Sequence, residues 1–82
     1  DIETIVESVR KTGRCVVASQ AISIGSFTGE IASQIMARAF DYLDAPVVRV
    51  GAKDGIAPQS HILEAAFLPN ANDIAAAARS IL

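Results

Sequence analysis

The sequence is poor in several features that mark particular classes of protein. Its 82 residues include no tryptophan and one cysteine, Cys15, and aromatic residues make up 5% of the chain. A single cysteine cannot form a disulfide within the chain, which favours a reducing compartment. No apolar run approaches the roughly 20 residues that cross a bilayer, and the acidic opening segment is not a basic signal-peptide region. We therefore expect an intracellular protein with no membrane partner.

Basic charge is scarce as well. Seven Lys and Arg residues stand against nine Asp and Glu residues, giving a net charge of −2. The densest basic stretch is the pair Arg10-Lys11, with Arg14 nearby. Nucleic-acid-binding domains carry a basic patch or stripe, so the sequence predicts no nucleic-acid partner.

Hydrophobic residues, mostly Ala, Ile and Val, make up 51% of the chain and are arranged in periodic segments. Helical spacing predicts helices over 2–11, 28–43, 60–67 and 71–81, with Asp1 as a cap and Gly13 as a stop for the first. Short β-branched runs predict buried strands over 15–18 and 47–50, and residues 19–29 and 51–60 are expected to be loops. This alternation predicts a parallel sheet with a helical crossover.

The long central helix has an unusually broad apolar surface. Ile31, Ile35, Ala39 and Tyr42 form one predicted stripe, and Ala32, Met36, Phe40 and Leu43 lie beside it. Such breadth is typical of a helix that packs on a sheet and also touches a second partner. In the last helix, Ile74, Ala78 and Ile81 are predicted to face inward.

Two strands are too few for a stable sheet, because isolated two-stranded units are marginal in water. Either a strand precedes residue 1 or a partner provides one. We therefore expect residues 1–82 to be one partial domain of a longer chain.

Residues with chemical potential are few. His61 is the only histidine and has no Cys or second His at ligand spacing, so a capping or exposed role is favoured over metal or acid–base chemistry. Cys15 lies in a predicted strand and is expected to be a buried, inert thiol. No catalytic, cofactor-binding or metal-binding residue is predicted.

The segment Gly25-x-x-x-Gly29 follows a strand and opens a helix, so its N–H groups could hold a phosphate. It lacks the Lys-Ser/Thr of a P-loop, and the Glu30 carboxylate occupies the positive end of the helix. Close chain packing is the favoured explanation of these glycines. The alternative function is a stand-alone phosphate- or nucleotide-binding α/β module.

Four stretches together resemble the C-terminal domain of transketolase-type beta subunits in the pyruvate, branched-chain 2-oxo acid and acetoin dehydrogenases. They are residues 5–14 (IVESVRKTGR), 29–32 (GEIA), 39–50 (AFDYLDAPVVRV) and 63–69 (LEAAFLP), and the third is the most specific. The chain departs from the family pattern at Gln20, at Gly25-Ser26 and at residues 55–59, in loops that face partner subunits in the family.

The resemblance implies a three-layer α/β/α domain with a small, mostly parallel sheet that lacks its first strand. It implies an assembly and docking role in a 2-oxo acid dehydrogenase. Thiamine diphosphate, magnesium and the catalytic groups would lie on other domains, so the 82 residues alone would be inactive. The implied partners are an alpha subunit and a second beta subunit in an α2β2 assembly, and the acyltransferase core. The implied location is the bacterial cytoplasm or, in a eukaryote, the mitochondrial matrix or a plastid.

Acidic groups provide the candidate interface. Because the acyltransferase's small binding domain is typically basic in the family, charge complementarity favours acidic docking contacts. The candidates are Asp54, Glu64, Asp73 and the terminal carboxylate of Leu82. A merely solvated acidic face is the competing interpretation. Glu30, in the family-like stretch 29–32, is a further interface candidate that would pair with a neighbouring strand or subunit; the alternative is that it only favours the helix start.

Overall fold

The computed structural model describes residues 1–22, 24–52 and 68–82. In these ranges the helices are α1 (Ile2–Thr12), α2 (Phe27–Ala39) and α4 (Ala71–Ser80), and a 3-10 helix, η1 (Phe40–Tyr42), follows α2 directly. The strands are β1 (Val16–Ile22) and β2 (Val48–Ala52). They pair in parallel with Val16 opposite Val48, and α2 makes the crossover between them.

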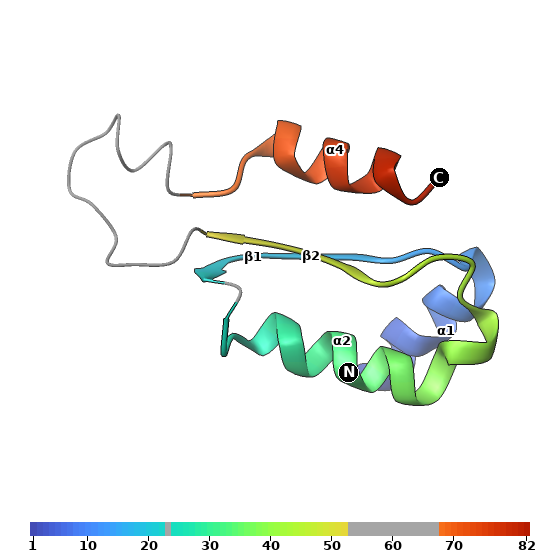
Figure 1. Cartoon of the computed structure of the whole chain (residues 1–82). Coiled ribbons are helices and arrows are strands. Elements are labelled where there is room, and N and C mark those ends of the chain that lie inside the picture. The colour runs from blue at the N-terminus through green and yellow to red at the C-terminus, as the bar shows by residue number, and fades with distance from the viewer. Residues whose placement is uncertain (23, 53–67) are drawn as a thin grey trace.

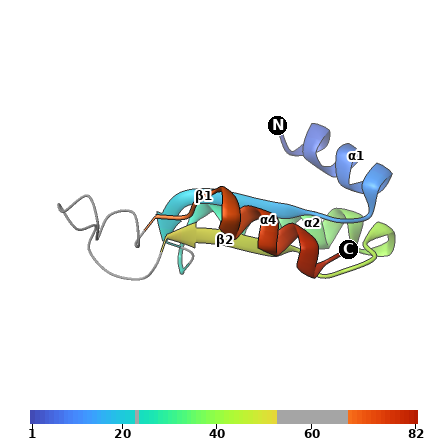
Figure 2. The same ribbon diagram turned by 90° about the horizontal axis from the view of Figure 1, so that it is seen from above.

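The helices lie on both faces of this sheet. Helices α1 and α2 cover one face and α4 covers the other (Figure 1). Seen from above, α1 lies outward of β1, on the side away from β2 (Figure 2). The predicted α/β fold, with a small parallel sheet between two helical layers, is confirmed.

The core lies on the α1–α2 side of the sheet. Its buried members are Val6 and Val9 from α1 and Ile35 and Ala39 from α2. Ile35 is fully buried, and the half-buried Val17, Leu43 and Val47 pack around this cluster. Helix α4, by contrast, contains no buried residue.

Local signals at the ends of α1 work as predicted. The Asp1 side chain accepts a hydrogen bond from the Thr4 backbone N–H, which fills one of the unpaired donors of the first turn. At the other end Gly13 takes a left-handed conformation, with φ at 77°, and its N–H donates to the Val9 carbonyl at 2.8 Å. Both the cap and the glycine stop are confirmed.

The first strand is longer than predicted. We expected residues 15–18, whereas β1 runs from Val16 to Ile22 and thus takes four residues from the predicted loop. Ile22 pairs with Ala52 after an irregularity in register that follows Ala18. The polar Ser19-Gln20 pair does not end the strand, because half of a strand's side chains can face outward. The second strand is likewise shifted, to Val48–Ala52 instead of 47–50.

The helix predicted over 28–43 is α-helical only as far as Ala39, and a 3-10 turn follows. Ile35 and Ala39 of the predicted stripe are buried as expected, but Tyr42 is 52% exposed. The reason is that η1 has three residues per turn, so residues after Ala39 rotate off the stripe. Instead, the Arg10 guanidinium lies over the Tyr42 ring, with Arg10 Cζ 5.3 Å from the ring centroid.

The last helix matches its predicted range within one residue, and two of its three residues predicted to face inward, Ala78 and Ile81, do so. Ile74 is 41% exposed, whereas Ala75, Ala77, Ala78 and Ile81 are half-buried. The face that meets the sheet is therefore mostly alanine. The predicted helix 60–67 lies outside the described residues, and no described helix has the length and apolarity required to cross a membrane.

Candidate functional site

Three segments that are far apart in the sequence meet around the side chain of Arg14. Arg14 Nε donates a hydrogen bond to the Ile81 carbonyl at 2.5 Å, across a separation of 67 residues. Arg14 Nη1 also lies 3.8 Å from Asp44 Oδ2. One guanidinium therefore joins the start of β1, the segment before β2 and the end of α4. We call Arg14, Asp44, Ile81 and Leu82 the Arg14 edge.

The backbone fixes the same junction. The Asp44 N–H donates to the Gly13 carbonyl at 2.7 Å. A Cβ at Gly13 would collide with the Asp44 carboxylate and would lie 3.2 Å from the Tyr42 carbonyl oxygen. Gly13 thus serves two purposes, because it provides a left-handed helix end and allows the 42–44 segment to approach closely.

The Arg14 edge is open to a partner. The side chains of Arg14 and Asp44 are 40% and 62% exposed, and Leu82 is 86% exposed. The guanidinium is shared between a carbonyl and a carboxylate, so the Asp44 charge is only partly offset. The Arg14 edge is therefore suited to binding a partner. Its exposed carboxylate attracts a cationic group, and Leu82 provides apolar area beside it.

The predicted interface residues do not gather at one place. Asp73 is the third residue of α4, where its carboxylate accepts from the Asn70 N–H in a capping box. Leu82 lies at the opposite end of that helix, and ten helical residues span about 15 Å. Glu30 lies in the first turn of α2, on the other face of the sheet, and accepts from Gln34 at 2.9 Å. Asp54 and Glu64 lie outside the described residues.

Sequence reasoning did not select Arg14 or Asp44. Asp44 occurs there only within the family-like stretch 39–50. Arg14 occurs only within the stretch 5–14 and near the basic pair Arg10-Lys11. The glycine at position 13 was the available signal, because a required glycine often marks a close approach. The contact between Arg14 and Ile81 has no local sequence signal.

The Gly25–Gly29 segment is explained by chain geometry. Gly25 has a φ of 68°, which favours glycine, and open space surrounds the position of its missing Cβ. A Cβ at Gly29 would lie 3.1 Å from Arg49 Nη1, closer than side chains usually approach. This tight contact supports the packing interpretation of Gly29.

Other groups give no reactive site in the described part of the chain. Cys15 is half-buried just before β1, and desolvation raises the pKa of its thiol, which opposes formation of a nucleophilic thiolate. No three His, Cys, Asp or Glu side chains of residues 1–22, 24–52 and 68–82 gather as a metal would require. His61 lies outside these ranges.

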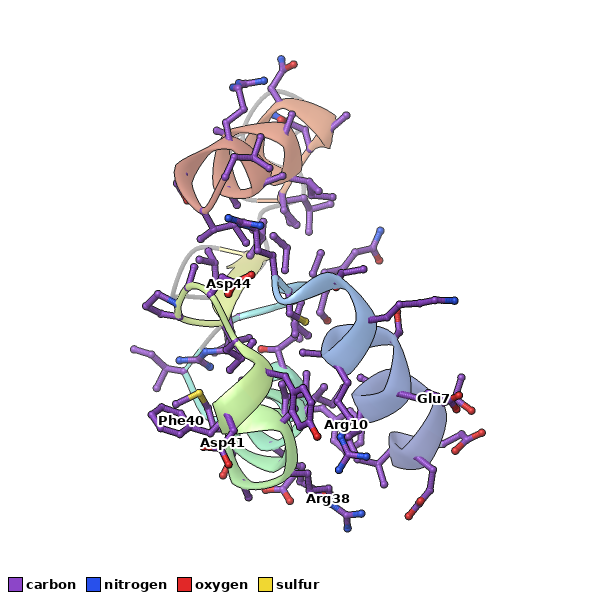
Figure 3. The ribbon with its side chains drawn as sticks, turned by 90° about the vertical axis from the view of Figure 1, so that its right-hand side faces the viewer. Glu7, Arg10, Arg38, Phe40, Asp41 and Asp44 are labelled. Atoms are coloured by element: carbon purple, nitrogen blue, oxygen red, sulfur yellow. The ribbon has the colours of Figure 1, made fainter. Side chains whose placement is uncertain are left out.

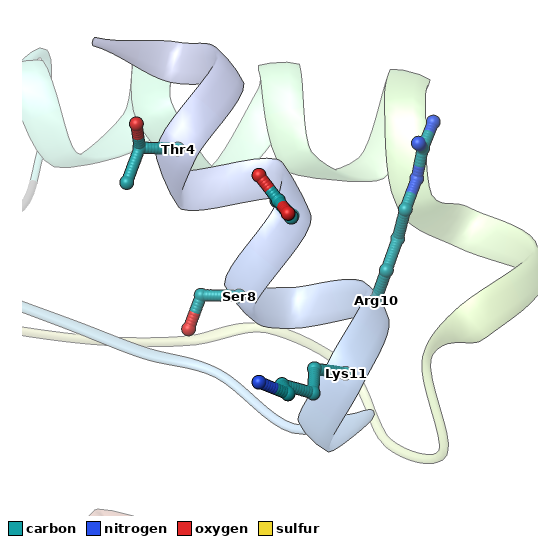
Figure 4. A pocket seen from close by; sticks show the side chains of 5 residues that line it. Thr4, Ser8, Arg10 and Lys11 are labelled. Carbon is teal, nitrogen blue, oxygen red and sulfur yellow. The ribbon is translucent and has the colours of Figure 1, made fainter.

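A shallow hollow of about 510 Å³ lies on the outer surface of α1 (Figure 4). Thr4, Glu7, Ser8, Arg10 and Lys11 line it, all from one helix. Binding pockets usually combine apolar walls with polar groups from several elements. This hollow has neither a second element nor a buried polar group, so we assign it no ligand.

The comparisons with known proteins agree with this architecture. The model of the transketolase C-terminal domain family matches residues 1–74. The pyruvate dehydrogenase E1 component subunit beta of Rhizobium meliloti (strain 1021) is 40% identical over 81 residues, which are 99% of this chain and 18% of that protein. The Bacillus subtilis (strain 168) subunit of the same name is 40% identical over the whole chain, which covers 25% of its length.

A relative named for another substrate is almost as similar. The 2-oxoisovalerate dehydrogenase subunit beta of Pseudomonas aeruginosa PAO1 is 39% identical over all 82 residues, or 23% of its length. The chain thus spans about a quarter or less of these relatives. The family match over 74 residues and the parallel α/β architecture lead to one conclusion: this chain belongs to the transketolase C-terminal domain family.

Proposed function

We propose that the chain is the assembly and docking domain of the beta subunit of a 2-oxo acid dehydrogenase complex. The full-length subunit would take part in oxidative decarboxylation of a 2-oxo acid. Its partners would be an alpha subunit and a second beta subunit in an α2β2 assembly, together with the acyltransferase core. Its location would be the bacterial cytoplasm or, in a eukaryote, the mitochondrial matrix or a plastid. Relatives named as E1 beta subunits support the proposal.

The observation that carries the docking role is the Arg14 edge. Arg14 holds Asp44 and the end of α4 together, so an exposed carboxylate and an exposed Leu82 share one end of the sheet. Chemistry would come from elsewhere in the full-length enzyme. Thiamine diphosphate and magnesium would bind on other domains.

The proposal also treats the chain as part of a larger domain. Helices α1 and α2 cover the same face, and a parallel β-α-β connection is nearly always right-handed. A strand leading into α1 would then pair with β1 on the side away from β2, under α1. An open groove of about 500 Å³ lies there, between α1 and the start of β1, and Ile5, Val9, Cys15 and Val16 are among its lining residues. We propose that the groove receives this strand.

Binding of the acyltransferase core to the full α2β2 enzyme tests the docking role. Asp44→Asn removes the edge carboxylate with little change in shape, and we expect it to weaken binding by about tenfold in calorimetric titration. Decarboxylation of the free 2-oxo acid, followed with an artificial electron acceptor, should stay unchanged, because the chemistry lies on other domains.

Glu7→Gln is the matched control. It removes an exposed carboxylate from the side of α1 that faces away from α2 and lies apart from Asp44 (Figure 3). Binding by this variant should equal that of the unmodified enzyme. Equal losses in both variants, or decarboxylase activity in the isolated 82 residues, would contradict the proposal.

A further inference from the structure

Helix α4 is held against the sheet differently from α1 and α2. None of its residues is buried, and the residues that face the sheet are mostly alanines, which bury little apolar area each. Arg14, which precedes β1, reaches the far end of this helix, where its Nε donates to the Ile81 carbonyl at 2.5 Å. Without this hydrogen bond, α4 would rest on the sheet mainly through alanine contacts.

The sheet face beneath α4 is apolar. Successive side chains of a strand point to opposite faces of the sheet. Val47 packs on the α1–α2 core, and Arg49 lies close to Gly29 of α2, so Val48 and Val50 face the α4 side. Both of these valines are half-buried, and α4 contacts the strand that carries them. Movement of α4 away from the sheet would therefore bring Val48 and Val50 into contact with water.

We propose that α4 is a releasable latch, which Arg14 holds closed over Val48 and Val50 and which opens while the α1–α2 core stays folded. The closed form contains the Arg14 edge. The open form loses this edge, because Ile81 and Leu82 leave with the helix. The balance between the two forms therefore sets how much of the protein presents the edge. Opening requires no partner, so the latch stands or falls separately from the docking function.

Asp44 makes the latch sensitive to salt. Arg14 Nη1 lies 3.8 Å from Asp44 Oδ2, whereas a different nitrogen, Nε, donates to Ile81. The carboxylate therefore orients the guanidinium without occupying the nitrogen that holds α4. The Arg14 and Asp44 side chains are 40% and 62% exposed, so dissolved salt screens their attraction. Added salt loosens Arg14 and shifts the latch towards its open form.

Hydrogen exchange, read by mass spectrometry on the full-length protein, measures this opening. The latch predicts faster exchange in α4 than in α1 and α2. Arg14→Met keeps a long apolar side chain but removes the guanidinium, and it should speed exchange in α4 about tenfold without changing α1 or α2. Arg38→Met is the matched control, because Arg38 pairs with Glu3 at 3.3 Å on the side of the molecule away from α4 (Figure 3). Exchange in α4 should then change by less than about twofold.

A salt titration gives the second readout. Between about 0.05 M and about 0.5 M sodium chloride, exchange in α4 should rise about twofold in the unmodified protein and stay constant in Asp44→Asn. Equal exchange in α4 and the α1–α2 core, or an equal acceleration of both by Arg14→Met, would overturn the latch. A salt response that persists in Asp44→Asn also contradicts it. Should Arg14→Met not fold, the salt titration of the other two proteins decides.

These outcomes are separate from those of the docking test. A latch that behaves as expected in an enzyme that does not bind the acyltransferase core would leave the inference standing and the docking role refuted. Normal binding with no separate opening of α4 would do the reverse.

Discussion

The two faces of the sheet are covered by helices that are held in different ways. On one face, α1 and α2 bury Val6, Val9, Ile35 and Ala39 against each other and the sheet. On the other face, α4 buries no residue completely, although it has the more complete N-terminal cap, a reciprocal capping box between Asn70 and Asp73. Local signals therefore define α4 as a helix, whereas tertiary packing defines α1 and α2.

This difference indicates how stability is distributed. Packing of an apolar face supplies most of the stability of helices in proteins, and capping adds only about 1 kcal/mol. Helix α4 meets the sheet mainly through alanines and is joined to it by the Arg14–Ile81 hydrogen bond. We expect α4 to open locally at lower free energy than α1 and α2. Surfaces that bind partners are often drawn from such regions.

The sharpest test of the comparison is the same substitution on both faces. Ile35→Ala removes a fully buried side chain and should lower the free energy of unfolding by about 2–5 kcal/mol. Ile74→Ala, at a residue that is 41% exposed on α4, should cost less than about 1 kcal/mol. Hydrogen exchange, read by mass spectrometry on the full-length chain, measures the loss of unfolding free energy in both variants. Equal costs would show that the two faces are equally packed.

Two glycines with positive φ provide the next test. Gly13→Ala places a Cβ against the Asp44 carboxylate in addition to the left-handed strain, and we expect a loss of about 3 kcal/mol. Gly25→Ala meets open space, so only the conformational cost of about 1–2 kcal/mol applies. Thermal unfolding of the two variants gives the difference. A larger loss for Gly25→Ala would be inconsistent with the close approach at Gly13.

The fold and the site differ in how far the sequence could predict them. Hydrophobic periodicity and the Gly13 stop gave the order of the elements, because these signals act over a few residues. The buried positions Ile35 and Ala39 followed from the same periodicity. Tyr42 did not, because nothing local showed that the α-helix would tighten into η1. Likewise, the extension of β1 to Ile22 depends on its pairing with Ala52 of β2, about 30 residues away.

The candidate site was the least predictable part. Charge selected Asp73 and Leu82, and the family-like stretch 29–32 selected Glu30, but the structure places these residues on different faces or at opposite ends of α4. The Arg14 edge depends on contacts across 30 and 67 residues, which no pattern within a helix or strand encodes. Long-range geometry decides which charges become neighbours.

A smaller effect is expected at the cap of α4. Asn70→Ala removes the side chain that accepts from the Asp73 N–H at 2.9 Å and should cost about 1 kcal/mol. Because the cap is local, the faster hydrogen exchange should be confined to the first turns of α4 and should not reach α1. Faster exchange throughout the α1–α2 core would instead show that α4 is essential to that core.

The smallest expected effect concerns the contact between α1 and η1. Tyr42→Leu removes the ring beneath the Arg10 guanidinium and should cost about 0.5–1 kcal/mol, because the pair is exposed. Tyr42→Phe keeps an aromatic face and should be nearly neutral. Chemical denaturation of both variants tests the pair, and equal losses would assign the effect to the hydroxyl group instead of the ring.

The long-range contacts of Arg14 determine when, during synthesis of the chain, a partner can first recognise the Arg14 edge. The surface around Arg14 does not exist in any short peptide, since its parts come from the start, middle and end of the chain. A ribosome releases the last of these parts only after the other two have been made. A partner that recognises this surface would therefore bind only chains that have been synthesised past residue 81 and have folded.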